Sequence, residues 1–122
     1  MLTEIKNLKQ TAGEPAKRWF NNASMDLFVW HEKNKIIGFQ LCYDKEKNEK
    51  ALSWYKGNGF QHQKVDDGEN RSGRYKATPL LLQNESFEFN NITEEFKKHS
   101  LHLVGEIKGF ILNKIKEADE EY

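Results

Sequence analysis

The fold is decided by residues 26–55, DLFVWHEKNKIIGFQLCYDKEKNEKALSWY. This stretch is rich in Phe, Trp, Tyr, Ile and Val, which favour strands, and its apolar runs are separated by turns rich in Asn and Lys. A two-residue turn over 34–35 would join a strand over 26–33 to one over 36–44. A loop over 45–48 would then return the chain into a third strand. We therefore expect two consecutive antiparallel hairpins.

Both hairpin registers place large apolar side chains on one face. In the first hairpin Trp30 would lie opposite Phe39, and in the second Phe39 would lie opposite Trp54. Further pairs in the same registers are Asp26 with Tyr43, Phe28 with Leu41, Leu41 with Leu52 and Asp44 with Glu49. A slip of one residue would turn every side chain over, because successive residues of a strand point to opposite faces. The agreement of the two registers predicts one aromatic face that includes Phe28, Trp30 and Trp54.

The next hairpin has two alternative closures. Its turn would form at Gly57-Asn58 or at Asn58-Gly59, and the choice rotates the following strand, with His62, relative to the sheet. A last strand over 74–83 is expected at a sheet edge, because Pro79 lacks a backbone donor.

Both ends of the chain carry helical spacing. Leu2, Ile5 and Leu8 predict a short N-terminal helix. The C-terminal segment begins with a helix cap at 91–94, and apolar residues then recur at helical spacing over 103–115. This C-terminal helix is expected to cover the aromatic face of the sheet. Two of its residues, Gly105 and Gly109, are expected where the helix approaches the sheet closely.

The predicted fold class is α+β: a meander of about five antiparallel strands with C-terminal helices packed on one face. A chain of 122 residues is long enough for one domain, so 1–122 is expected to form a single unit. Its acidic end, 116–122, is expected to be a frayed tail.

Composition narrows the partners and the compartment. Lys and Arg total 19 and Asp and Glu total 19, so the formal net charge is zero, which argues against nucleic acid as the main partner. No apolar run approaches the roughly 20 residues that cross a bilayer, so no membrane partner is expected. The polar N-terminal segment does not resemble a secretory signal, and Cys42 has no second cysteine for an internal disulfide. A reducing cytoplasm is therefore the expected location.

The sheet face opposite the aromatic one is the predicted ligand surface. On the same registers it carries Gln40, Ser53 and Tyr55, with small side chains at its centre. If the third hairpin closes at Gly57-Asn58, His62 lies opposite Ser53, and the last strand brings further polar groups beside it. The predicted ligand-binding residues are Gln40, Ser53, Tyr55, His62, Lys76 and Thr78. Convergent polar groups around small residues suit a small molecule or a partner protein, whereas the plain alternative is an ordinary solvated sheet face.

The sequence leaves enzymatic activity undecided. His62 is the best candidate for acid–base catalysis, with Asp66 or Asp67 to orient it, but no catalytic residue can be assigned. No cofactor and no metal are predicted, because His99 and His102 have helical spacing but lack further ligands. Cys42 is expected to be a structural thiol.

Four segments resemble a family of short bacterial proteins. They are KRWF at 17–20, DLFVW at 26–30, GFQLCYDK at 38–45 and RYKATP at 74–79. No activity, cofactor or catalytic residue is attached to that family, so the resemblance implies only a bacterial cytoplasmic protein. The function we expect from the sequence is a non-catalytic binding module, with a small acid–base enzyme and a homodimeric assembly component as the alternatives.

Overall fold

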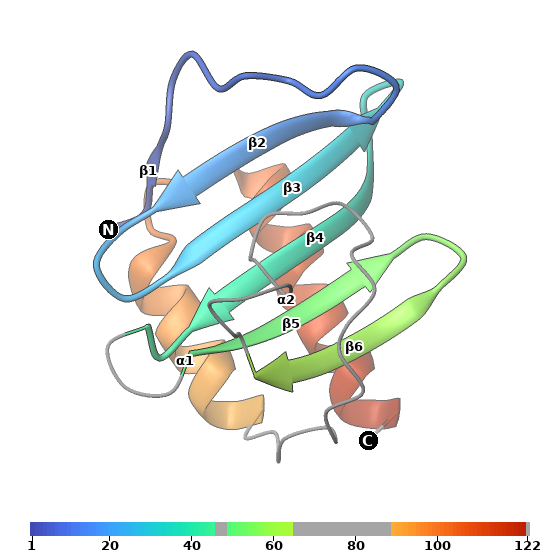
Figure 1. The fold of residues 1–122 in the computed structure, drawn as a ribbon. Helices are drawn as coiled ribbons and strands as arrows, with labels where there is room; N and C mark the ends of the chain where they lie inside the picture. Colours follow the sequence, from blue (N-terminus) through green and yellow to red (C-terminus); the bar gives the residue numbers. More distant parts are fainter. Residues whose placement is uncertain (46–48, 65–88, 122) are drawn as a thin grey trace.

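The computed structural model describes residues 1–45, 49–64 and 89–121. Within these ranges the chain forms one antiparallel sheet whose six strands follow one another in chain order (Figure 1). The strands are β1 (Thr3–Glu4), β2 (Ala16–Asn21), β3 (Asp26–Glu32), β4 (Lys35–Tyr43), β5 (Lys50–Tyr55) and β6 (Gly59–Lys64). Two helices follow, α1 (Phe89–His99) and α2 (Gly105–Glu121). The predicted α+β meander is confirmed, with six strands in place of about five. The strand expected over 74–83 lies outside the described residues.

The N-terminal segment forms a strand, so the predicted N-terminal helix is wrong. β1 pairs with the end of β2, and the N–H group of Leu2 donates a hydrogen bond of 2.8 Å to the carbonyl oxygen of His99 at the end of α1. Leu2 itself is buried in the core. These contacts with distant parts of the chain outweigh the helical spacing of a few apolar residues, because short isolated helices are marginal in water.

A β-bulge makes the predicted register of the first hairpin wrong by one residue. The turn lies at Lys33-Asn34, where both residues have positive φ (52° and 65°), as the tight turns of hairpins require. Between Trp30 and His31 the register shifts, so that Trp30 lies opposite Gly38. The bulge leaves Ile37 as an extra residue on β4 and turns β3 over relative to the prediction.

The second hairpin confirms its predicted register, and the third follows neither predicted closure. Phe39 lies opposite Trp54, and Gln40 lies opposite Ser53. The third hairpin instead closes through a three-residue turn, with Tyr55 opposite Gly59. The positive φ of Gly57 (87°) and Gly59 (78°) permits this turn. Further pairs are Leu41 with Leu52, Leu52 with His62 and Ser53 with Gln61.

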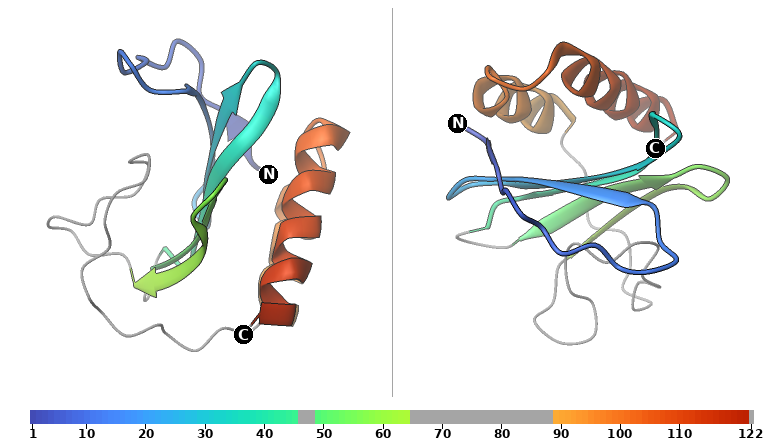
Figure 2. Two further views of the ribbon diagram at one scale, coloured as in Figure 1. Left: turned by 90° about the vertical axis from the view of Figure 1, so that its right-hand side faces the viewer. Right: turned by 90° about the horizontal axis from the view of Figure 1, so that it is seen from above.

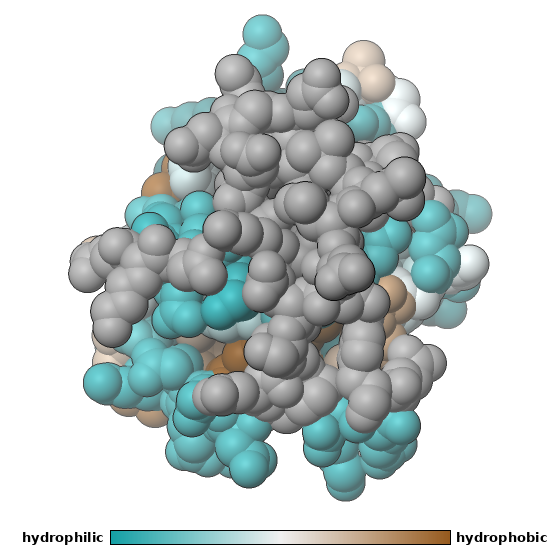
Figure 3. All heavy atoms as spheres, turned by 60° about the horizontal axis from the view of Figure 1, so that its bottom comes forward, coloured by the Kyte–Doolittle hydropathy of each residue, from teal (hydrophilic) through white to brown (hydrophobic). Residues whose placement is uncertain are grey.

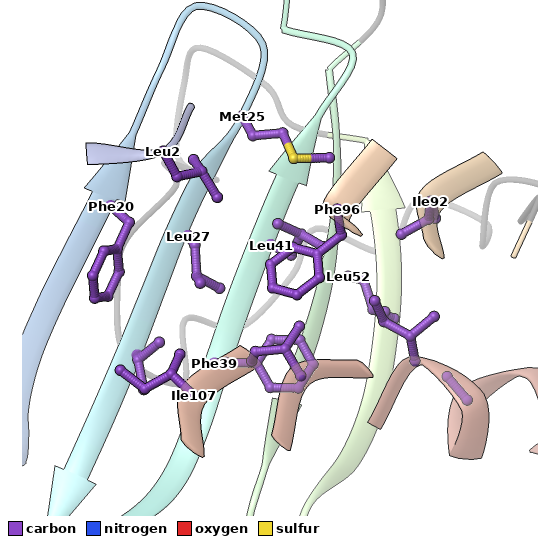
Figure 4. Close-up of a cluster of buried hydrophobic side chains, with 14 residues drawn as sticks. Leu2, Phe20, Met25, Leu27, Phe39, Leu41, Leu52, Ile92, Phe96 and Ile107 are labelled. Carbon is purple, nitrogen blue, oxygen red and sulfur yellow. The ribbon is translucent and has the colours of Figure 1, made fainter. Parts of the chain in front are cut away.

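Both helices cover the same face of the sheet (Figure 2). The main core lies between them and the sheet, as Figure 4 shows from the side of the helices. Its buried members are Leu2, Phe20, Met25, Leu27, Val29, Phe39, Leu41, Leu52, Ile92, Phe96, Ile107, Ile111, Ile115 and Ala118. The predicted cover of one face by the C-terminal helices is therefore confirmed. Phe28 and Trp30, however, belong to a second buried cluster and not to this core.

The solvent side of α2 differs from the prediction at its two glycines. Gly105 and Gly109 are exposed, and a Cβ atom at either would meet nothing within 4 Å, so the expected close approach to the sheet is wrong. α2 itself continues to Glu121. Burial of Ala118 against the core holds this last part of the helix in place.

The described residues on one face of the molecule are largely hydrophilic. In Figure 3 hydrophilic residues dominate the described part of the visible face, and hydrophobic areas are small. This agrees with a content of 31% charged residues. None of the described helices combines the length and the apolar character that spanning a membrane requires.

Candidate functional site

Four aromatic rings form a continuous row on the sheet face that the helices do not cover. We call Trp19, Phe28, Trp30 and Tyr55 the aromatic row; they come from β2, β3 and β5. Ring centroids of successive members lie 5.5, 6.3 and 5.8 Å apart, and the first two pairs are stacked. Such spacings allow favourable contact between neighbouring rings. Trp19 is partly exposed, and the other three rings are buried.

Gly38 allows the row to cross strand β4. Trp30 on β3 and Tyr55 on β5 both lie opposite Gly38, one on each side. A Cβ atom built on Gly38 would lie only 2.7 Å from Cδ1 of Tyr55, so the Tyr55 ring rests directly on the glycine. The absence of a side chain at this position is what lets the two rings meet.

Small and polar side chains lie beside the row on β4 and β5. We call Gln40, Cys42, Ala51 and Ser53 the floor, and all four are buried. Within it the Gln40 Nε2 donates to Ser53 Oγ at 3.4 Å, and the Cys42 thiol lies 3.9 Å from Gln40 Oε1. The amide of Gln40 and the hydroxyl of Ser53, which the sequence predicts on one face, are therefore hydrogen-bonded to each other within the floor.

The buried carboxylate of Asp26 contacts three other side chains at one end of this face. Oδ1 of Asp26 accepts hydrogen bonds from Trp19 Nε1 at 2.9 Å and from Asn21 Nδ2 at 2.6 Å. Its Oδ2 forms an ion pair with Lys45 at 3.0 Å. The hydrogen bond from Trp19 fixes the orientation of that indole ring. Because three donors already surround the carboxylate, Asp26 is poorly suited to serve as a catalytic base.

The structure brings together three of the six predicted site residues. Gln40, Ser53 and Tyr55 share the floor and the row as expected, but their exposed fractions of 4%, 2% and 2% contradict an open, solvated surface. His62 lies opposite Leu52 on the helix-covered face, so its predicted position beside Ser53 is wrong. The three-residue turn causes this difference, because it shifts β6 by one residue. Lys76 and Thr78, like the aspartates proposed to orient His62, lie outside the described residues.

Sequence reasoning missed Phe28, Trp30 and Trp19 as members of this face. The first two were assigned to the opposite face through the shifted register of the first hairpin. The adjacent apolar residues Ile36 and Ile37 carry a signal for the bulge, because two neighbouring apolar residues break a strict alternation.

The histidines do not form a metal centre within the described residues. There, no group of three or more His, Cys, Asp or Glu side chains is placed to hold a metal ion. His99 instead joins the turn before β3 to α1: its Nδ1 lies 2.9 Å from Asn22 Nδ2 and its Nε2 lies 3.2 Å from Glu95 Oε2.

The fold and this site together define an α+β meander domain with two apolar faces, one under helices and one lined with rings. Comparisons with protein-family models, with curated proteins and with solved structures give no match.

Proposed function

We propose that the protein is a non-catalytic binding module that holds a small, flat, largely apolar molecule against the aromatic row and the floor. The observation that supports this function is the arrangement of the face. Contiguous rings border small side chains, and one amide and one hydroxyl lie among them. Ligand sites are typically apolar and aromatic, with few polar groups that set the orientation of the ligand.

The side chains of the proposed site are already shielded from water by the chain itself. Phe28, Trp30, Cys42 and Ala51 are exposed by 6% or less. A ligand must therefore displace the atoms that cover these groups. Once bound it would be shielded from water in their place, and each Å² of apolar area removed from water contributes about 25 cal/mol. The ligand class that fits is therefore apolar and compact, and polar contacts to Gln40 and Ser53 would orient it.

Indole N–H signals offer a direct test, because the chain has three tryptophans and they lie on different faces. Trp19 and Trp30 belong to the aromatic row, whereas Trp54 faces the helices and contacts Phe110 with a centroid distance of 5.5 Å. The ¹⁵N-labelled chain would be titrated with 1-naphthol as a flat apolar probe. We expect the indole signals of Trp19 and Trp30 and the side-chain amide signal of Gln40 to shift, while the Trp54 signal stays in place.

A variant with a filled floor provides the control. Ala51 is fully buried on the floor, and Ala51→Val adds two methyl groups there. We expect this variant to bind 1-naphthol more weakly than the unchanged chain. Equal binding by the variant, shifts confined to Trp54, or no shift with a saturating probe would each refute the proposed site. Native mass spectrometry of the purified chain would show in addition whether a small molecule is retained.

A further inference from the structure

A tyrosine and a histidine form a hydrogen-bonded pair on the helix-covered face. Tyr43 on β4 and His62 on β6 reach across β5, and their rings are stacked with centroids 5.9 Å apart and planes 17° apart. The Tyr43 hydroxyl and the Nε2 atom of His62 share a hydrogen bond. His62 is fully buried, whereas Tyr43 is only partly buried. The imidazole is therefore shielded from water, whereas the tyrosine as a residue keeps partial exposure.

A lysine lies beside Tyr43 on the neighbouring strand β5. Lys50 is directly opposite Tyr43 in the β4–β5 ladder, so the two side chains share a face. Its Nζ atom lies 4.0 Å from Asp44 Oδ2, and the Lys50 side chain is 19% exposed. Tyr43 thus has a hydrogen-bonded imidazole and a lysine opposite it on the next strand. The imidazole can take up a proton, and the positive charge of the lysine would favour negative charge that develops on the phenol oxygen.

We propose that Tyr43 is a nucleophile toward activated acyl compounds, with Nε2 of His62 as its proton acceptor. The phenol oxygen forms a bond to the carbonyl carbon, and the phenolic proton passes to Nε2. The bond from the carbonyl carbon to the leaving group then breaks, and the leaving group departs with the electron pair. It takes the proton from the imidazolium, so the products are an O-acyl tyrosine and the protonated leaving group. This site is on the opposite face of the sheet from the aromatic row, so it does not depend on the proposed binding function.

Selective acetylation of the folded full-length chain tests the proposal. The reagent is N-acetylimidazole, whose leaving group is imidazole, and the modified tyrosines are located by mass spectrometry of peptides. Rates are expressed relative to N-acetyltyrosinamide in the same solution, which corrects for reagent decay and for the pH dependence of the reagent. We expect Tyr43 to react much faster than Tyr55, which is only 2% exposed.

Three variants separate proton transfer from simple covering of the ring. His62→Gln keeps a polar side chain but removes the base, and it should lower the Tyr43 rate by about tenfold or more. Lys50→Gln should lower the rate by a smaller factor. His99→Gln is the matched control, because His99 contacts Asn22 and Glu95, and it should leave the rate unchanged.

Whether the acetylation rate of Tyr43 falls or rises in the His62→Gln variant decides between proton transfer and simple covering of the ring. If His62 merely covers Tyr43, the His62→Gln variant reacts equally fast or faster, and the proposal is overturned. N-acetyltyrosinamide reacts through its phenolate and speeds up with every pH unit. The rate at Tyr43 relative to it should therefore fall as the pH rises beyond the range in which histidines commonly titrate, about pH 5 to 8, because a fully deprotonated base gives no further gain. Should the His62→Gln variant fail to fold, this pH profile decides alone, and a flat profile would refute proton transfer to His62.

Discussion

Replacing Gly38 by alanine tests the contact that joins the two halves of the aromatic row. The added Cβ would lie 2.7 Å from Tyr55 Cδ1 and 3.2 Å from the Trp54 carbonyl oxygen, both closer than ordinary van der Waals contact. Tyr55 is buried and the second neighbour is backbone, so neither can move away easily. Overpacking of this kind costs about 1–3 kcal/mol of the free energy of unfolding. For a domain of this size that is a fall in Tm of about 3–15 °C.

Urea denaturation followed by circular dichroism measures this change, and Gly109→Ala provides the matched control. A Cβ at Gly109 would meet nothing within 4 Å, so the same substitution there should stabilise the helix by about 0.5–1 kcal/mol. In a Tyr55→Ala background the ring is gone and only the 3.2 Å contact with the Trp54 carbonyl oxygen remains, so Gly38→Ala should then cost less than it does in the unchanged chain. A Gly38→Ala chain as stable as the unchanged protein would refute the contact between Tyr55 and the glycine.

Three further predictions concern polar groups. Asp26→Asn removes the negative charge that faces Lys45 and should lower the free energy of unfolding in urea by about 1–3 kcal/mol; no loss would mean that the ion pair contributes nothing. Burial lowers the pKa of His31 below 6.5, so the folded chain should lose stability as the pH falls below that value. His31→Gln should remove this loss, which urea midpoints at about pH 7.5 and about pH 5 would show, and an unchanged pH dependence would contradict it. The Gln10 amide bonds both the N–H (2.8 Å) and the C=O (3.0 Å) of Lys17 at the edge of β2. Gln10→Ala should therefore promote self-association through this edge, and a sedimentation profile that stays the same would argue against such a role.

The register of the β4–β5 hairpin could be predicted from the sequence because its alternation is clear. Phe39 and Leu41 are apolar, and Gln40 between them is polar, so the sequence shows which face of β4 points to the core. Ser53 and its apolar neighbours mark β5 in the same way. The pairing observed between these strands, and with it the placement of Gln40 and Ser53 on one face, follows from that pattern.

The register of the β3–β4 hairpin could not be predicted in this way. Residues 27–30 are apolar at every position, so turning the strand over exchanges one apolar face for another. Leu27 and Val29 are buried in the main core, and Phe28 and Trp30 are buried on the opposite face. When both faces of a strand are buried, hydrophobic pattern does not distinguish one register from the other.

The face of the sheet on which His62 lies could not be predicted from the sequence either, but for a different reason. Two glycines flank Asn58, and glycine permits several tight turns with little difference in backbone energy. The turn that forms places His62 beside Tyr43, a residue 19 positions away that local spacing does not connect to it.

By itself, the sequence determined the class of each central element, the antiparallel order of the hairpins and the helical cover at the C-terminal end. These follow from side-chain propensity, turn chemistry and apolar spacing, which act over a few residues. Only the tertiary structure decided which side of the sheet Phe28, Trp30 and His62 occupy. That choice depends on one bulge and one turn, whose energies are settled by how two buried faces pack and not by any local preference.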